Sequence, residues 1–346
     1  MSTAEDAAAH RSGPIPPAGR GELSHAVLRA LRTRPGGEHA LPTGGAVDGA
    51  DPYGEDLHLA LYVCYELHYR GFRDADPGWE WNPELLGLRA GLERRFLDAL
   101  RTDTEAAPHS VDEAFAGILV EPPDGKGLSH FLRDEGELWQ LREYAAQRSL
   151  YHLKEADPHA WVIPRLRGRA KAGMVAVEFD EFGAGAADRM HSRLFADLMT
   201  DLGLDTTYGR YVDVAAAEML ASVNLMSVFG LHRALRGALV GHFASVEVTS
   251  SPASRRLAEA MRRADAGAAA VRFYAEHVEA DAVHEQVVRR EVVGGLLEEE
   301  PWLEADVAFG IEATNLLDAR LGDRTLSAWR RGRSSLRAPL RPPDHR

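Results

Sequence analysis

The stretch FYAEHVEADAVHEQVV, residues 273–288, carries two histidines and an aspartate at helical spacing. At about 100° per residue, Asp281 lies roughly 40° from His277 around a helix, and His284 lies roughly 20° from it on the other side. All three side chains therefore share one stripe of a predicted helix over 268–298. Two imidazoles and a carboxylate on one stripe can bind one metal ion or two neighbouring ions. For this motif alone, a solvated polar stripe is the alternative.

A second stretch, VEFDEFGAGAADRMHSRLF at residues 177–195, places a glutamate and a histidine ten residues apart. On a straight helix Glu181 and His191 would face different directions. The intervening Gly183 and Gly185 permit a bend that can bring the two side chains together. We therefore expect Glu181 and His191 to belong to the same site.

Two further acidic residues of this stretch have competing interpretations. Asp188 can pair with a neighbouring arginine, or it can accept a hydrogen bond from a ligating imidazole. Glu178 precedes Glu181 by one helical turn, so it can face inward or remain a surface acid. Either residue is an additional candidate ligand.

Two other glutamates stand in unusual helical surroundings. Glu155 ends LYHLKEADPH (150–159), just before a predicted helix break, and Glu247 lies in the apolar, small-residue stretch LVGHFASVEVTS (239–250). An ionised glutamate among apolar residues is costly unless it is paired or bound to a cation. Glu143, on the same predicted helix as Glu155, competes with it for the same role.

Together these segments offer carboxylates and imidazoles from four helices. The candidate metal ligands are Glu155, Glu181, His191, Glu247, His277, Asp281 and His284. A carboxylate-rich set with three imidazoles is the composition expected of a non-haem di-iron or di-manganese site in a helical scaffold. The ferritin-like version needs Glu-x-x-His pairs, which do not occur at suitable places here.

The same residues resemble the haem-oxygenase-like non-haem di-iron oxidase and oxygenase family, also described as iron-containing redox enzymes. The resemblance spans about residues 128–320 and is carried by LKEADPH, DEFGAG, MHSRLF, LGLDTTYGRY, FGLHRALRGALVGHFASVE and HVEADAVHE. It implies an all-α, haem-oxygenase-like helical bundle. It also implies the family's ligand order, in which one Glu is followed by a Glu and a His, another Glu, and then H-x3-D-x2-H. That order falls on the seven candidates.

The resemblance further implies an oxidoreductase with two Fe(II) per chain and O2 as co-substrate. The expected reaction is the oxidation of a small molecule in specialised metabolism, such as an amino acid, an amine or a fatty-acid-like compound. N-oxygenation, desaturation and oxidative C–C cleavage are all open, because fold and ligands do not choose among them. The alternatives are a non-catalytic helical binding or scaffold protein, and a di-metal hydrolase or metal-storage protein.

The composition of the chain limits the kinds of molecule and bound group that we expect it to have as partners. The chain has 346 residues, 40 Lys+Arg against 53 Asp+Glu and a net charge of −13, which disfavours a nucleic-acid partner. Its one cysteine, Cys64, excludes an internal disulfide, a thiolate zinc site and a protein-ligated iron–sulfur cluster. No apolar run approaches the roughly 20 residues that span a bilayer, so we expect a cytoplasmic protein with no membrane partner. We expect a small-molecule substrate, and leave an external electron donor and a homodimer open.

The predicted organisation has three parts. Residues 1–52 are expected to be a flexible leader, 53–335 a single helical domain, and 336–346 a flexible tail. Within the domain, 53–125 holds N-terminal helices and 128–320 the metal-binding core. Within the leader we expect one short helix, around residues 23–32. The other predicted helices cover 57–72, 82–102, 135–155, 165–182, 184–202, 212–229, 231–248, 253–264, 268–298 and 303–319.

Four basic or histidine side chains flank the helix that holds Glu247. They are His232, Arg233, Arg236 and His242. They can contact an anionic substrate, or they can be ordinary surface charge. The sequence leaves both interpretations open.

Overall fold

The computed structural model describes residues 13–37, 41–42, 44–105, 110–120 and 125–340, and these residues form helices and no strand. The helices are α2 (Glu22–Ala30), α3 (Gly44–Asp48), α4 (Glu55–Glu66), α5 (Pro83–Asp103), α6 (Val111–Leu119), α7 (Leu128–Asp134), α8 (Leu138–His152), α9 (Asp157–Ala160), α10 (Gly168–Glu181), α11 (His191–Asp201), α12 (Ala217–Leu231), α13 (Arg236–Arg263), α14 (Ala268–Val287), α15 (Gly294–Glu299) and α16 (Glu304–Trp329). The predicted all-α class is confirmed. Among these helices, none is both long and apolar enough to cross a membrane.

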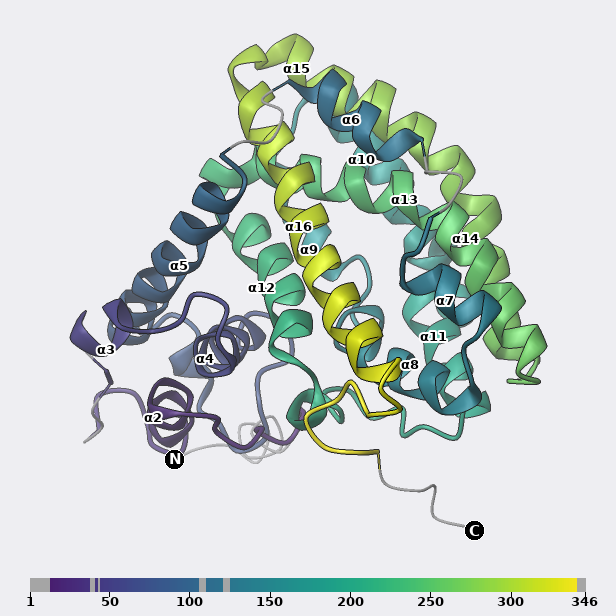
Figure 1. The fold of residues 1–346 in the computed structure, drawn as a ribbon. Helices are drawn as coiled ribbons and strands as arrows, with labels where there is room; N and C mark the ends of the chain where they lie inside the picture. The colour runs from purple at the N-terminus through teal and green to yellow at the C-terminus, as the bar shows by residue number, and fades with distance from the viewer. Residues whose placement is uncertain (1–12, 38–40, 43, 106–109, 121–124, 341–346) are drawn as a thin grey trace.

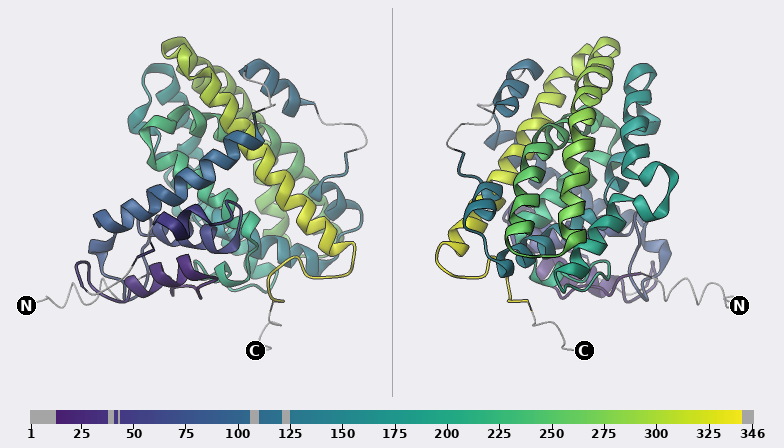
Figure 2. Two further views of the ribbon diagram at one scale, coloured as in Figure 1. Left: turned by 60° about the vertical axis from the view of Figure 1, so that its left-hand side comes forward. Right: turned by 90° about the vertical axis from the view of Figure 1, so that its right-hand side faces the viewer.

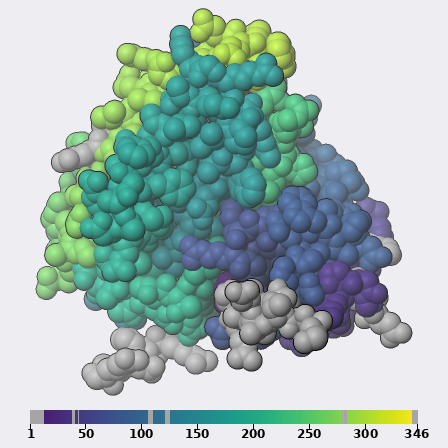
Figure 3. All heavy atoms as spheres, turned by 180° about the vertical axis from the view of Figure 1, so that it is seen from behind, coloured from purple at the N-terminus to yellow at the C-terminus, as the bar shows by residue number. Residues whose placement is uncertain are grey.

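Four long helices form the body of the molecule. α13 packs between α14 and α16, and α12 lies against α16 (Figure 1). The N-terminal helices α2 to α5 gather at one end of this bundle in both views of Figure 2. From behind, the purple and blue N-terminal helices lie directly against the teal middle part of the chain, as Figure 3 shows.

Helix α5 begins where its sequence predicts. The side chain of Asn82 accepts hydrogen bonds from the backbone N–H groups of Glu84 (3.0 Å) and Leu85 (2.9 Å). Pro83 fills the first helical position, where a missing N–H costs nothing. The Asn-Pro pair is therefore both the cap and the start of the helix.

Helix α13 contradicts one sequence prediction. The pair of helices predicted over 231–248 and 253–264 is one continuous helix, with Pro252 in its interior. Proline removes one backbone hydrogen bond and usually breaks a helix. Here α13 packs along both α14 and α16, and we attribute its continuity to this packing, which outweighs the local cost.

Two glycines allow α13 and α16 to cross with their backbones in contact. A Cβ atom on Gly241 or on Gly310 would collide with a backbone carbonyl of the other helix. The close crossing brings His242, which follows Gly241, against Thr314, which lies one turn after Gly310. The two side chains are hydrogen-bonded, with 2.8 Å between Nδ1 and Oγ1.

Part of the expected leader is packed onto the bundle. Helix α2 is capped by Asp56 of α4, whose carboxylate accepts from the backbone N–H groups of Leu23 (2.9 Å) and Ser24 (2.8 Å). Val27 of α2 is fully buried. The short helix expected around residues 23–32 is thus present as α2, and an apolar face and a cap from another helix hold it in place.

The apolar interior falls into two clusters, and a cavity of about 350 Å³ lies between them. Phe243 and Leu317 line it from the first cluster, while Leu257 and Phe273 line it from the second. Four of the seven candidate ligands line the same cavity. These are Glu155, Glu181, Glu247 and His277.

Candidate metal centre

The turn between α10 and α11 brings the first glutamate–histidine pair together. Glu181 ends α10 and His191 begins α11. Between them Gly183, Ala184 and Gly185 have φ angles of 72°, 52° and 82°, in the left-handed region that reverses the chain. As a result, Nδ1 of His191 lies 2.7 Å from Oε2 of Glu181. The expected approach is confirmed, but the helix predicted from residue 184 begins only at His191, because those angles are not helical.

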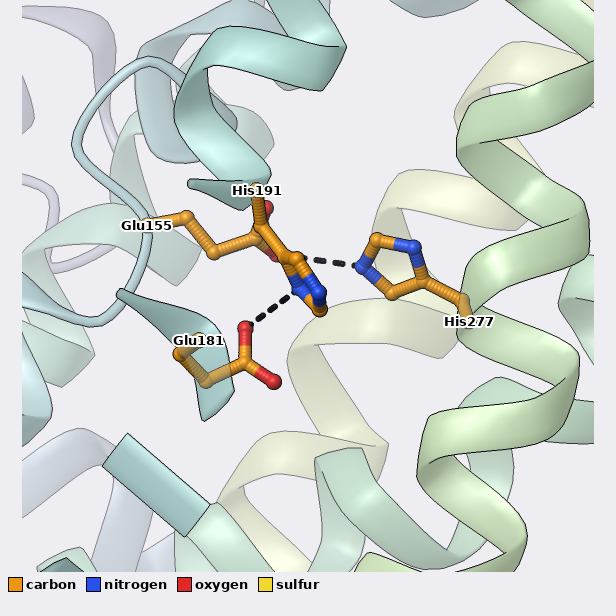
Figure 4. A group of neighbouring side chains, drawn as sticks. All are labelled: Glu155, Glu181, His191 and His277. Carbon is orange, nitrogen blue, oxygen red and sulfur yellow. Dashed lines mark ion pairs between the residues drawn. The ribbon is translucent and has the colours of Figure 1, made fainter. Parts of the chain in front are cut away.

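The first cluster consists of four buried side chains from different segments. Glu155, Glu181, His191 and His277 each offer one ligand atom, and these four atoms lie within 4.8 Å of one another. Figure 4 shows His277 reaching across from α14 toward the other three residues. Its Nε2 atom is 3.9 Å from Oε1 of Glu155. Such a group of oxygen and imidazole donors can hold a metal ion.

A second cluster shares Glu181 with the first. Glu181, Glu247 and His284 offer atoms within the same 4.8 Å limit, and all three are buried. Nδ1 of His284 lies 3.3 Å from Oε2 of Glu247 and 3.6 Å from Oε1 of Glu181. Glu181 therefore directs Oε2 toward His191 and Oε1 toward His284, so this one carboxylate contributes to both clusters.

The structure thus brings together six of the seven candidate ligands. The seventh, Asp281, lies on α14 between His277 and His284, but its side chain is outside the described part of the structure. Its role as a ligand stays a prediction.

The tautomer of His277 suits a metal ligand. Its Nδ1 atom lies 2.7 Å from the backbone carbonyl oxygen of Phe273, which can only accept a hydrogen bond. Nδ1 therefore carries the proton, and the lone pair of the neutral ring is on Nε2. This atom is the one directed at Glu155 and the first cluster.

Burial and mutual contact shift the pKa values of these groups. Burial lowers the pKa of His284, but the carboxylates of Glu247 and Glu181 outweigh it and raise the pKa to about 9. Burial raises the pKa of Glu247, and the His284 imidazole only partly opposes this. For Glu155, burial is outweighed by the His152 and His277 imidazoles, so its pKa falls below its usual range. Protons thus offset part of the carboxylate charge when no metal is bound.

Two histidines beside the site were missed by sequence reasoning. His152 lies with Nδ1 2.8 Å from Oε1 of Glu155, and both His152 and His159 line the cavity. The spacing of three residues between His152 and Glu155 could have identified His152 as a neighbour of this ligand, because residues three apart lie on one helix face. His159 lies after the predicted helix break, where helical periodicity no longer predicts which way a side chain points.

The three competing acids lie outside the two clusters. Glu143 is buried, but it accepts hydrogen bonds from Trp329 Nε1 (2.9 Å) and from the backbone N–H of Ser335 (2.8 Å). Asp188 is exposed. Glu178 is buried, and neither of its carboxylate oxygens has a hydrogen-bond partner among the described residues. Burial raises the pKa of Glu178 well above its usual range.

Of the four residues flanking the Glu247 helix, only His242 lines the cavity. His232 pairs with Glu93 (2.9 Å), and Arg236 pairs with Glu300. Arg233 is exposed. The surface-charge interpretation therefore holds for Arg233, while His232 and Arg236 contact glutamates away from the cavity.

The fold and the site together define a class of protein, an all-α bundle with a buried carboxylate–histidine centre beside a cavity. The family model described as "iron-containing redox enzyme" matches residues 142–319, just over half of the chain. The chain belongs to this family, and the resemblance read from the sequence is confirmed. It is an oxidoreductase family whose members contain iron, which agrees with the buried histidine and glutamate clusters.

A relative with an assigned activity supports the same placement. A nitrosourea synthase from Streptomyces achromogenes subsp. streptozoticus is 25% identical over 252 residues, covering 70% of this chain and 53% of the relative. The chain therefore spans about half the length of the curated relative it matches.

Proposed function

We propose that this protein is a non-haem di-iron oxidase or oxygenase that uses two Fe(II) and O2 to oxidise a small molecule in specialised metabolism. The observation that carries the proposal is Glu181, whose two carboxylate oxygens belong to two adjacent clusters of buried ligands. A single ion would need only one of these clusters. Two clusters sharing one carboxylate fit two ions at the spacing of about 3.5–4 Å typical of two-metal sites.

The charges of the proposed ligand set support two divalent ions. Glu155, Glu181 and Glu247, with Asp281 as the predicted fourth, supply four negative charges. Two Fe(II) supply four positive charges, so the occupied centre would be neutral in a buried site. Oxygen and imidazole donors without thiolate also suit iron. The donor set is therefore consistent with the family's metal.

When bound, the two Fe(II) would supply two electrons for the reduction of O2. Insertion of one oxygen atom consumes one substrate, one O2, two electrons and two protons, and gives the hydroxylated substrate and water. The protein itself would hold the ligand side chains in position and orient the substrate beside them. Phe273 fixes the ring of His277, His152 fixes Glu155, and the cavity keeps the substrate next to the ligands. A separate donor must restore the electrons after each turnover.

Among the outcomes open to such a centre, we favour oxidation of nitrogen. A nitrosourea contains an oxidised nitrogen, and the nitrosourea synthase is similar over 70% of this chain. Desaturation and oxidative C–C cleavage of an amino acid or fatty-acid-like compound are the other outcomes to be tested.

The test is anaerobic loading with Fe(II) followed by exposure to O2. We expect O2 consumption and a transient visible absorption band, and neither in the zinc-loaded protein or in Glu181→Ala. An iron-loaded protein that consumes no O2 would be a hydrolase or a storage protein instead. A protein that binds no metal would be a helical scaffold.

A further inference from the structure

The cavity beside the metal centre contains two buried histidines that the proposed centre does not use. His159 and His242 both line it, and each has 1% of its surface exposed. Their ring centroids are 5.2 Å apart. The Nε2 atom of each ring is buried and has no hydrogen-bond partner among the described residues. A buried polar atom without a partner is costly, which indicates that something else supplies the partner.

The hydrogen bonds of Thr314 fix the tautomer of His242. Thr314 Oγ1 donates its single proton to the carbonyl oxygen of Gly310, at 2.7 Å. The same oxygen lies 2.8 Å from Nδ1 of His242, so it can only accept there. Nδ1 of His242 therefore carries the ring proton, and Nε2 presents a lone pair.

The ring of His242 also stays neutral. Burial, together with the neighbouring His159 imidazole, lowers the pKa of His242 well below its usual range. Burial lowers the pKa of His159 to about 4. At neutral pH, Nε2 of His242 is thus a permanent hydrogen-bond acceptor inside the cavity.

We propose that Nε2 of His242 accepts a hydrogen bond from an N–H group of the substrate, and that the substrate is a small nitrogen compound such as an amine, amidine or guanidine. This inference rests on the proposed function, because it takes the cavity beside the metal centre as the substrate site. It selects among the substrates left open above. The carboxylate or alkyl chain of a fatty acid has no donor to offer, so it would leave Nε2 of His242 unsatisfied.

The surroundings of His242 fit a small, flat molecule. Phe243 lies against the His159 ring, with centroids 4.9 Å apart, and both residues line the cavity. The volume of about 350 Å³ is at the small end of ligand sites. A planar amidine or guanidine can lie along these rings while its N–H reaches His242.

The test uses zinc-loaded protein, which binds ligands without turnover and gives clear NMR spectra. The probes are benzamidine, methylguanidine and benzylamine as N–H donors, with hexanoate as the fatty-acid comparison. Dissociation constants come from calorimetry for wild type, His242→Phe and His242→Gln. The Phe variant keeps a ring and removes the acceptor, whereas the amide oxygen of Gln can take the place of Nε2.

We expect at least one donor probe to bind wild type more tightly than hexanoate does. That affinity should fall about tenfold or more in His242→Phe and recover in His242→Gln. Hexanoate binding should not change. The ¹⁵N signal of His242 Nε2 in wild type should shift when the donor binds, which tests the contact without any variant.

Three results would overturn the inference. They are no binding of any donor probe to wild type, equal donor affinity in wild type and His242→Phe, and an unshifted Nε2 signal in the bound state. None depends on O2 consumption. Failure of the proposed function would instead appear as an iron-loaded protein that does not react with O2, whatever the outcome of the binding experiment.

Discussion

Nδ1 of His191 lies 2.7 Å from Oε2 of Glu181, although one residue begins a helix and the other ends the preceding one. The contact leaves Oε1 of Glu181 on the side of His284. One carboxylate thereby joins the two clusters, and the loss of Glu181 should not be equivalent to the loss of other ligands.

Replacement of Glu181 by Ala should remove both irons, whereas Glu247→Ala should leave about one iron per chain. Glu181 belongs to both clusters, and Glu247 to one of them. Elemental analysis after anaerobic reconstitution measures the difference, with O2 uptake as a second readout. Asp188→Ala is the matched control, because this acid is exposed and should keep wild-type iron content. Equal iron loss in Glu181→Ala and Glu247→Ala would contradict the shared role.

The two glutamates that competed for the first ligand position should behave oppositely. Glu155→Ala should lose iron with little change in folding. Glu143→Ala should keep its iron but unfold more easily, because the buried donors of Trp329 and Ser335 lose their acceptor. The expected cost is about 1–3 kcal/mol in the free energy of unfolding. Chemical denaturation and iron analysis on both variants decide this, and iron loss in Glu143→Ala would reverse the assignment.

Metal binding should release protons. The pKa of His284 is raised to about 9 in the metal-free protein, and that of His191 is also raised by Glu181, against the effect of burial. At pH 7 the His284 imidazole holds a proton that it must lose to bind iron, and the raised pKa of His191 acts in the same direction. Affinity should therefore increase with pH, by up to about tenfold per unit for each proton released. Anaerobic calorimetry in buffers of different ionisation enthalpy counts the protons. Affinity that is flat between pH 6.5 and 8.5 would contradict these pKa directions.

The same shift has a consequence for the metal-free fold. A histidine with a raised pKa stabilises the folded state fully below its ordinary value of 6.5, and this contribution is lost as pH rises through about 9. The free energy of unfolding of metal-free protein should therefore decrease over this range. In His284→Gln the decrease should be smaller, and an unchanged pH dependence in that variant would assign it to other groups.

The glycine crossing of α13 and α16 should tolerate no side chain. Gly241→Ala and Gly310→Ala would each push a methyl group into a backbone carbonyl, and overpacking of this kind costs about 1–3 kcal/mol or more. Gly322→Ala, also on α16, is the control, because nothing lies within 4 Å of its added Cβ atom. It should be neutral or stabilising, since Ala favours helix. Thermal unfolding compares the three, and a neutral Gly241→Ala would show that the helices can separate without cost.

Sequence reasoning found the ligand candidates because their signals are local or chemical. His277 and His284 share a helix face by spacing alone, and Glu247 stands out as an acid in an apolar segment. The approach of Glu181 and His191 followed from the glycines between them. Family resemblance supplied the order that joined these pieces into one site.

The features that sequence reasoning missed depend on packing between distant segments. Pro252 predicted a break that packing of α13 against its neighbours overrides. Helix α2 is held by Asp56, a cap from another helix that no local pattern shows. His159 and the Thr314 partner of His242 became visible only once the helices were placed.

The proposed centre holds two irons through clusters that share Glu181. Its most direct test is anaerobic titration with Fe(II), followed by removal of unbound metal and measurement of iron per chain. We expect a value close to two. A value of one or less after full reconstitution, or a single zinc at full occupancy in protein as purified, would contradict it.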